Sequence, residues 1–98
     1  MSRRPWSYQE IYASVEAYME LLTAQQSGRP LVKADVRRRW LQGPLSGRTK
    51  GSYEFRMQNI SAVREALELP LVEGYRPAQN VGVRPRTLIT KAMIERSE

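Results

Sequence analysis

The first strong pattern along the chain is a run of apolar residues at helical spacing that covers residues 7–26. Its apolar positions are Ile11, Val15, Tyr18, Met19 and Leu22. Ser7 and Glu10 stand at the spacing of a capping box, and Ser27-Gly28 followed by Pro30 ends the pattern. Because the polar side of this helix is acidic, we expect it to belong to the scaffold and not to contact a polyanion.

A shorter apolar pattern predicts a helix over residues 33–42, with Val36 and Trp40 four positions apart and Gly43-Pro44 as the stop signal. Its three consecutive arginines are Arg37, Arg38 and Arg39. At ~100° per residue they sweep roughly 200° around the helix, so one partner surface cannot face all three. Two interpretations remain open: a solvated face whose arginine stems cover the core, or contact with phosphate groups.

The third apolar pattern predicts a helix over residues 52–68, with Ser52 as its N-cap and Pro70 as its stop. One apolar stripe consists of Tyr53, Met57, Ile60, Val63 and Leu67. A second stripe consists of Phe55, Ala62, Ala66 and Leu69, with Asn59 along it. A helix that is apolar on two sides is packed by neighbours on both, so we expect this one to be central.

The segment after this helix is rich in turn residues. Residues 69–85 hold three prolines and two glycines, which predicts a loop with at most a short hairpin around Glu73-Gly74. A short terminal helix is expected over residues 87–98. The predicted fold is therefore mainly α, a small bundle of three to four helices. Its second and third helices form an HTH-like or winged-helix-like arrangement, although their connector of about nine residues exceeds the usual three or four.

Composition narrows the chemistry that the chain can carry. A length of 98 residues predicts a single domain, 1–98. The chain has no cysteine and no histidine, which excludes zinc sites and Ser–His or Cys–His catalysis in their usual forms. We therefore expect a binding domain and not an enzyme, with no metal and no cofactor. No apolar run approaches the ~18 residues of a membrane span, and no signal peptide is visible, so a cytoplasmic location is expected.

The positive charge of the chain is concentrated in its middle. The net charge is +6, and residues 29–56 alone carry eight basic residues against Asp35 and Glu54. Residues 1–28 and 57–98 are each close to neutral. A local basic block on a small domain favours a polyanionic partner, most often a nucleic acid.

Residues 46–61, SGRTKGSYEFRMQNIS, are the strongest candidate site, because a basic loop leads there into a helix N-terminus, which attracts phosphate. The spacing matches no P-loop. The alternative is a surface loop that needs its glycines for turns. The residues predicted to contact the DNA backbone are Arg37, Arg38, Arg48, Thr49, Lys50, Ser52 and Arg76. Those predicted to read bases are Tyr53, Arg56, Gln58, Asn59, Tyr75 and Asn80.

Arg56 is the best of the base-reading candidates, since arginine can pair bidentately with guanine. Tyr53 and Asn59 could instead belong to the core. The basic-aromatic run GYRPAQN at 74–80 supplies Tyr75, Arg76 and Asn80, and its alternative is an ordinary rigid loop whose tyrosine covers the core.

The run GSYEFRMQNISAVREALELPLVEGYRPAQNVG resembles the N-terminal domain of McrA-like, modification-dependent HNH restriction endonucleases. The shared patterns are G-S-x-E-[FY]-[KR]-x-x-N-I-S-A-V, which residues 51–63 match, and G-Y-[KR]-P-x-x-N, which residues 74–80 match. The resemblance covers about residues 5–82. It implies a module that reads modified cytosine, with 5-methylcytosine expected, as the specificity domain of a restriction system in bacterial defence.

The nuclease implied by the resemblance would lie elsewhere in the parent protein, because an HNH site needs histidines and this chain has none. Residues 83–98 depart from the family pattern and would form a terminal helix or a linker to that missing nuclease domain. The expected partner is double-stranded DNA, read in the major groove, with base flipping as the second mechanism. The rival interpretations are a protein-interaction or general nucleic-acid-binding helical domain without modification specificity, and a small phosphate-processing enzyme.

Overall fold

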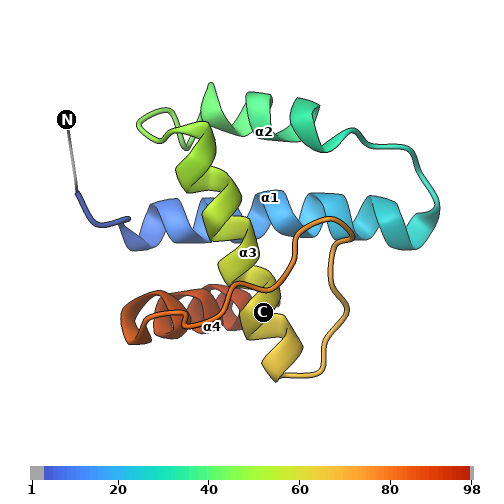
Figure 1. The fold of residues 1–98 in the computed structure, drawn as a ribbon. Coiled ribbons are helices and arrows are strands. Elements are labelled where there is room, and N and C mark those ends of the chain that lie inside the picture. Colours follow the sequence, from blue (N-terminus) through green and yellow to red (C-terminus); the bar gives the residue numbers. More distant parts are fainter. Residues whose placement is uncertain (1–3, 98) are drawn as a thin grey trace.

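Four α-helices make up the regular structure of residues 4–97, the part of the chain that the computed structural model describes. They are α1 (Tyr8–Ser27), α2 (Lys33–Leu41), α3 (Lys50–Ala66) and α4 (Val83–Ser97). The predicted mainly-α bundle of three to four helices is confirmed. Helix α1 runs along the molecule with α2 on one side and α4 on the other, and α3 crosses over them (Figure 1). None of these helices is long and apolar enough to cross a membrane.

Helix α1 begins where the capping box predicts. The Glu10 N–H donates to Ser7 Oγ at 3.1 Å, and the Ser7 N–H donates to Glu10 Oε1 at 2.9 Å, so two otherwise unpaired donors are satisfied. Gly28 ends the helix in the left-handed conformation, with φ of 73°. Both ends lie within a residue or two of the sequence-based boundaries.

Helix α3 begins two residues earlier than expected, and the prediction of Ser52 as its N-cap is wrong. Thr49 is the N-cap: its Oγ1 accepts from the Ser52 N–H at 3.1 Å, and the Thr49 N–H donates back to Ser52 Oγ at 3.1 Å. Two hydroxyl residues three positions apart can each serve as the cap. The earlier one prevails because the later one completes the reciprocal pair.

Helix α4 also begins earlier than expected, at Val83. Pro85 is its third residue, a position in the first turn where the missing N–H removes no helical hydrogen bond. The hairpin considered around Glu73-Gly74 does not form: these residues make a turn, and no strand occurs among residues 4–97. Gly74 has φ of 93°, a backbone conformation that residues with a side chain rarely adopt, so this turn favours glycine.

The core lies where α3 crosses α1. Its fully buried side chains include Ile11, Tyr18, Val36, Leu45, Tyr53, Met57, Ile60 and Ile89. The Tyr18 hydroxyl lies 2.8 Å from Ser61 Oγ and accepts from the Val72 N–H at 2.9 Å, which joins α1, α3 and the following loop. These contacts fix the position of α3 relative to the rest of the bundle.

The second apolar stripe predicted on α3 is only partly buried. Asn59 is 2% exposed, but Phe55 is 55% and Leu69 is 39% exposed. Helices α1, α2 and α4 all pack against α3, yet together they leave one side of its first half facing solvent. The expectation of a helix covered on both sides along its whole length is therefore wrong for Phe55.

Candidate nucleic-acid interface

The arginines of α2 are held in ion pairs with acidic residues of the same domain. Arg37 Nη1 lies 3.0 Å from Glu54 Oε2, and Arg38 Nη1 lies 3.1 Å from Asp35 Oδ1. Arg39 donates twice to Glu20. The Arg38 pair is exposed on both sides and contributes little, whereas Arg37 is about one-fifth exposed and links α2 to α3. Of the predicted backbone contacts on α2, Arg38 is the more accessible.

The Arg48 side chain is largely buried, and its guanidinium is hydrogen-bonded within the domain. Its guanidinium donates to Glu10 at 2.6 and 2.9 Å and to the backbone carbonyls of Arg4 and Pro5 at 3.0 and 3.1 Å. The side chain is only 9% exposed. Every nitrogen of this arginine is thus engaged, so Arg48 fastens the segment before α1 to the start of α3 and offers no free edge to a phosphate.

Of the other residues predicted to contact the DNA backbone at the start of α3, two are occupied by hydrogen bonds within the helix and one is accessible. The hydroxyls of Thr49 and Ser52 form the capping box and are occupied by it. Lys50 is exposed and has no partner within residues 4–97. Lys50 is therefore the one predicted backbone contact of this turn whose side chain is available to an anion.

Three of the predicted base-reading residues are buried. Tyr53, Asn59 and Tyr75 are 0, 2 and 3% exposed, which is the core alternative weighed for the first two and the covering-tyrosine alternative for the third. Neither tyrosine hydroxyl has a hydrogen-bond partner among the described residues. Burial raises the pKa of both tyrosines, that of Tyr75 to about 12. In this conformation none of these three side chains is accessible to a DNA base.

The remaining predicted residues lie at or near the surface. Gln58 is partly exposed, and its backbone carbonyl accepts from the Ala78 N–H at 3.1 Å, which pins the loop to α3. Arg76 is exposed, and Asn80 is exposed in a left-handed conformation with φ of 62° that asparagine tolerates. The fold thus places residues 74–80 beside α3. The sequence shows that both segments carry polar residues, but it does not show that they are neighbours.

Trp6 contacts three arginines that are far apart in the sequence, two through its ring and one through its backbone carbonyl. The guanidinium carbons of Arg56 and Arg48 lie 4.7 and 5.1 Å from the centroid of the Trp6 ring. Arg84 Nη2 donates to the Trp6 carbonyl at 2.8 Å. We call Trp6, Arg48, Arg56 and Arg84, together with Asn59, the Trp6 cluster. It joins the start of the chain to α3 and to the first turn of α4.

The Trp6 cluster carries more positive charge than its surroundings neutralise. Desolvation lowers the pKa of the Arg56 guanidinium, and the charges of Arg48 and Arg84 lower it further. Glu10, which pairs with Arg48, is the one carboxylate bonded to these arginines in the described part of the chain. Arg56 Nη1 donates to Asn59 Oδ1 at 2.9 Å, but Arg56 Nε and Asn59 Nδ2 are buried donors without an acceptor. An anion would supply the missing negative charge.

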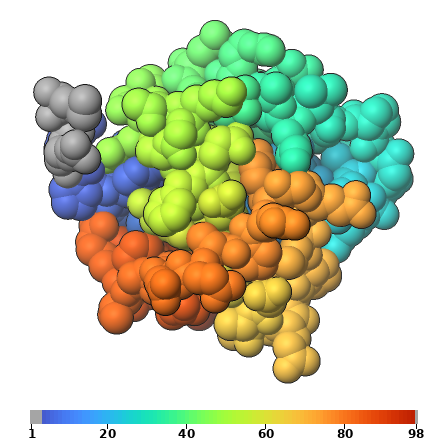
Figure 2. Space-filling view, in the orientation of Figure 1, coloured from blue at the N-terminus to red at the C-terminus, as the bar shows by residue number. Residues whose placement is uncertain are grey.

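Several basic side chains without a carboxylate partner come from two segments that are neighbours in the fold. Among residues 4–97 they include Lys50, Arg56, Arg76, Arg84 and Arg86. Their segments, the first half of α3 and residues 76–86, lie next to each other on the face seen in Figure 2. Within the same described residues, the acidic side chains left without a polar contact are Glu65, Glu68 and Glu73, at the far end of α3 and beyond it. We call the face with the free basic residues the basic face.

Sequence reasoning missed two residues of the basic face and the exposure of Phe55 on α3. Phe55 was expected in the core, and Arg84 and Arg86 fell in the segment that the family pattern does not cover. The sequence held one usable signal, the VRPR run at 83–86, in which two arginines flank a proline. The exposure of Phe55 had no such signal, because it depends on which side of α3 its neighbours leave open.

No group of histidine, cysteine, aspartate or glutamate residues in the described chain could hold a metal ion. Comparisons of the sequence with protein-family profiles and with curated proteins, and of the structure with solved structures, find no match.

Proposed function

We propose that this chain is a double-stranded DNA-binding module that prefers modified cytosine, with 5-methylcytosine the first candidate. It would serve as the specificity domain of a modification-dependent restriction protein whose nuclease lies in cis. The observation that carries the proposal is the basic face: five basic residues from α3, the following loop and α4 lack carboxylate partners there. Phosphate contacts supply most of the affinity of such modules.

The proposed docking puts the first half of α3 into the major groove, in an HTH-like manner. In that geometry the N-terminal residues of the second helix contact base edges, while flanking residues hold the backbone. Lys50 and the backbone N–H groups of the first turn of α3 would meet one phosphate. Arg76, Arg84 and Arg86 would contact the phosphates on the other side of the groove.

Modification reading is assigned to the exposed side of α3. Phe55 is 55% exposed, and an exposed apolar ring is the type of group that contacts a 5-methyl substituent in the major groove. Arg56 follows it directly and keeps its Nη2 unpaired within the described chain. This arginine could accompany the methyl contact by donating to the neighbouring guanine. The resemblance to McrA-like reader domains supports the same function.

Groove reading is favoured over base flipping because flipping needs a pocket with stacking side chains. Two pockets of residues 4–97 are lined by aliphatic, polar and charged residues and by no aromatic one. Neither pocket therefore offers a flipped base an aromatic side chain to stack on.

The decisive experiment is a titration of one duplex in two forms, with and without 5-methylcytosine, at several salt concentrations. We expect binding to both forms, tighter to the methylated one, with log K falling linearly against log salt. Absence of binding at low salt would refute DNA binding altogether. Equal affinity for both forms would leave a general nucleic-acid-binding domain and refute the reader function. A panel of other cytosine modifications then identifies the preferred base.

Two variants separate the proposed roles. Phe55→Ala should reduce the methylated-to-unmethylated affinity ratio, since it removes the apolar contact but no charge. Lys50→Ala should weaken both duplexes alike and leave the ratio unchanged. Arg29→Ala, which removes an exposed charge from the α1–α2 connection, is the matched control and should change neither. The reverse pattern between Phe55 and Lys50 would refute the assigned roles.

A further inference from the structure

Arg64, near the end of α3, is a buried arginine without a carboxylate partner. The residue is 7% exposed. Its Nε donates to the Pro70 carbonyl at 2.7 Å, and its Nη1 lies 3.6 Å from the sulfur of Met19. No acidic side chain of residues 4–97 pairs with it. Desolvation lowers the pKa of this guanidinium. Burial of a charge without a counter-charge is costly, so the position calls for an explanation.

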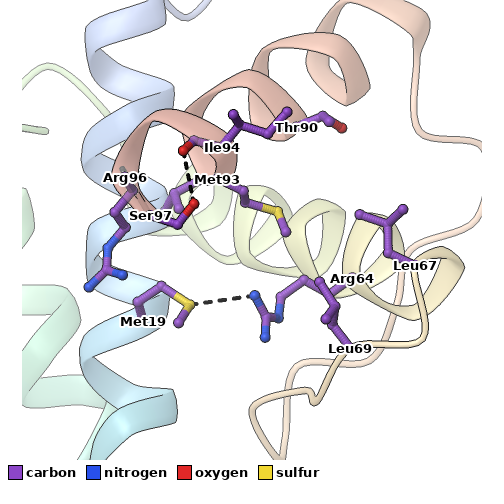
Figure 3. Close-up of a pocket in the computed structure, with 10 residues that line it drawn as sticks. Met19, Arg64, Leu67, Leu69, Thr90, Met93, Ile94, Arg96 and Ser97 are labelled. Atoms are coloured by element: carbon purple, nitrogen blue, oxygen red, sulfur yellow. Dashed lines mark hydrogen bonds between the residues drawn. The ribbon is translucent and has the colours of Figure 1, made fainter.

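The guanidinium of Arg64 lines an otherwise largely apolar pocket of about 330 Å³ between α1, α3 and α4. The apolar residues around it are Val15, Met19, Leu67, Leu69, Met93 and Ile94. Figure 3 shows the Arg64 guanidinium in contact with the Met19 sulfur, with Met93 and Ile94 on α4. The volume lies at the lower end of the range for small-molecule sites, which combine apolar walls with a few polar groups.

The second cation of the pocket is already neutralised. Arg96 Nε lies 2.5 Å from Glu16 Oε2, so the pocket presents one uncompensated positive charge and not two. A single charge at one side of an apolar space fits a monovalent anion. A phosphate monoester would bring close to two charges against one cation, whereas a carboxylate brings one and can accept a bidentate pair from an arginine.

The rim of the pocket is apolar and accessible. Leu67 is 52% and Ile94 is 55% exposed, and both are large aliphatic side chains beside the pocket. Arg64 Nη2 makes no hydrogen bond within the described chain, and this atom is accessible to solvent. A ligand that fills the pocket would cover the aliphatic rim with its body and bring its charged end to Arg64.

We propose that this pocket binds a small amphipathic monocarboxylate, a carboxylate attached to a short apolar chain. The carboxylate pairs with Arg64, and the chain packs between Met19, Met93 and Leu67. The site is independent of the basic face: Arg64 lies fourteen residues beyond Lys50 on the same helix, about 21 Å along its axis. Its test therefore does not depend on DNA binding.

The test uses the methionine methyl groups as reporters. The chain has four methionines, of which Met19 and Met93 line the pocket and Met57 is fully buried in the core outside it. The protein labelled with methyl-¹³C methionine is titrated with octanoate, and separately with butanoate and octan-1-ol. We expect saturable shifts at Met19 and Met93 with octanoate and none at Met57.

The two control ligands separate the apolar and the charged part of the site. Each buried methylene contributes about fourfold to affinity, so butanoate should bind more weakly by roughly tenfold or more. Octan-1-ol, which keeps the chain but lacks the charge, should also bind more weakly than octanoate. No saturable shift with octanoate, or equal binding of octanoate and octan-1-ol, overturns the proposal.

Variants then connect the binding to Arg64. Arg64→Met retains a long unbranched side chain but removes the charge, and should abolish the preference for octanoate over octan-1-ol. Because this variant also loses the bond to Pro70, Leu67→Asp serves as a second test at an exposed position. Its added negative charge should weaken octanoate binding severalfold. Leu31→Asp, at another exposed leucine outside the pocket, should not. Unchanged binding in Leu67→Asp contradicts the assigned position of the carboxylate.

Discussion

Arg48 holds Glu10 through two hydrogen bonds, from Nη2 to Oε1 at 2.6 Å and from Nε to Oε2 at 2.9 Å. The pair joins the chain just before α3 to the first turn of α1, and the Ser7 N–H donates to the same carboxylate. The bonds from Arg48 are the main cause that lowers the pKa of Glu10 to about 2. A residue that the basic loop offers for phosphate contact is therefore part of the scaffold.

Stability at low pH should depend on this pair. Because the pKa of Glu10 is lowered from 4.5 to about 2 in the folded protein, its contribution is present above pH 4.5 and is lost as pH falls toward 2. The contribution is on the order of 2 kcal/mol, since both side chains are largely buried. Urea unfolding of Glu10→Gln should show lower stability at pH 7 and a smaller difference from wild type near pH 2.5.

Glu65→Gln is the matched control for that measurement, because Glu65 is exposed and carries no ion pair within residues 4–97. It should follow the wild-type pH profile. If Glu10→Gln and wild type lose stability in parallel between pH 4.5 and 2.5, the ion pair does not contribute as argued.

The hydroxyl of Tyr18 should contribute to stability as the link between three segments. It lies 2.8 Å from Ser61 Oγ and accepts from the Val72 N–H at 2.9 Å, and Tyr18 itself is fully buried. Tyr18→Phe leaves two buried polar groups without their partner, so we expect a loss of about 1–3 kcal/mol in the free energy of unfolding. Tyr12→Phe, which removes a hydroxyl that makes no hydrogen bond within residues 4–97, should cost less than ~0.5 kcal/mol.

The start of α2 should be open to stabilisation. Val32 is its N-cap, with φ of −93° and ψ of 121°, is 58% exposed and makes no side-chain capping bond. Val32→Asp should raise the free energy of unfolding by about 1 kcal/mol, because a carboxylate at that position can accept from the first-turn N–H groups. Comparing the thermal unfolding midpoints of Val32→Asp and Val32→Ala measures the contribution of the capping carboxylate. Equal midpoints for the two variants would contradict the capping explanation.

Local patterns predicted the helices because their causes are local. The capping box of Ser7 and Glu10 and the stop at Gly28 are short-range signals, and α1 follows them closely. At α3 the same rule offered two hydroxyl residues, Thr49 and Ser52, and the choice between them needed the hydrogen-bond geometry. The early start of α4 was hidden by Pro85, which is usually a break and is tolerated in a first turn.

The candidate site was predicted less well because its charges are decided by distant partners. Arg48 pairs with a glutamate 38 residues away, and Arg37 with one 17 residues away. A sequence shows that these arginines are basic, but it does not show which of them the fold neutralises. Burial raises the same difficulty for Tyr53 and Tyr75, whose polar ends are enclosed once α3 and the loop are packed.

The difference between free and neutralised arginines leads to the last prediction, made for the DNA complex. Arg84 is exposed and bonded only to the Trp6 carbonyl in the described chain, while Arg38 is also exposed but paired with Asp35 at 3.1 Å. Arg84→Ala should weaken binding to methylated and unmethylated duplexes alike and reduce the slope of log K against log salt by about 0.9, the value of one phosphate contact on duplex DNA.

Arg38→Ala is the control because it removes the same charge from an exposed position on α2, outside the basic face. It should leave the slope nearly unchanged, since its charge is already partly neutralised by Asp35. The salt series for the two variants is measured on one duplex under identical conditions. A larger change in Arg38→Ala than in Arg84→Ala would move the interface from the α3–α4 side to α2, and would refute the basic face as the DNA-binding surface.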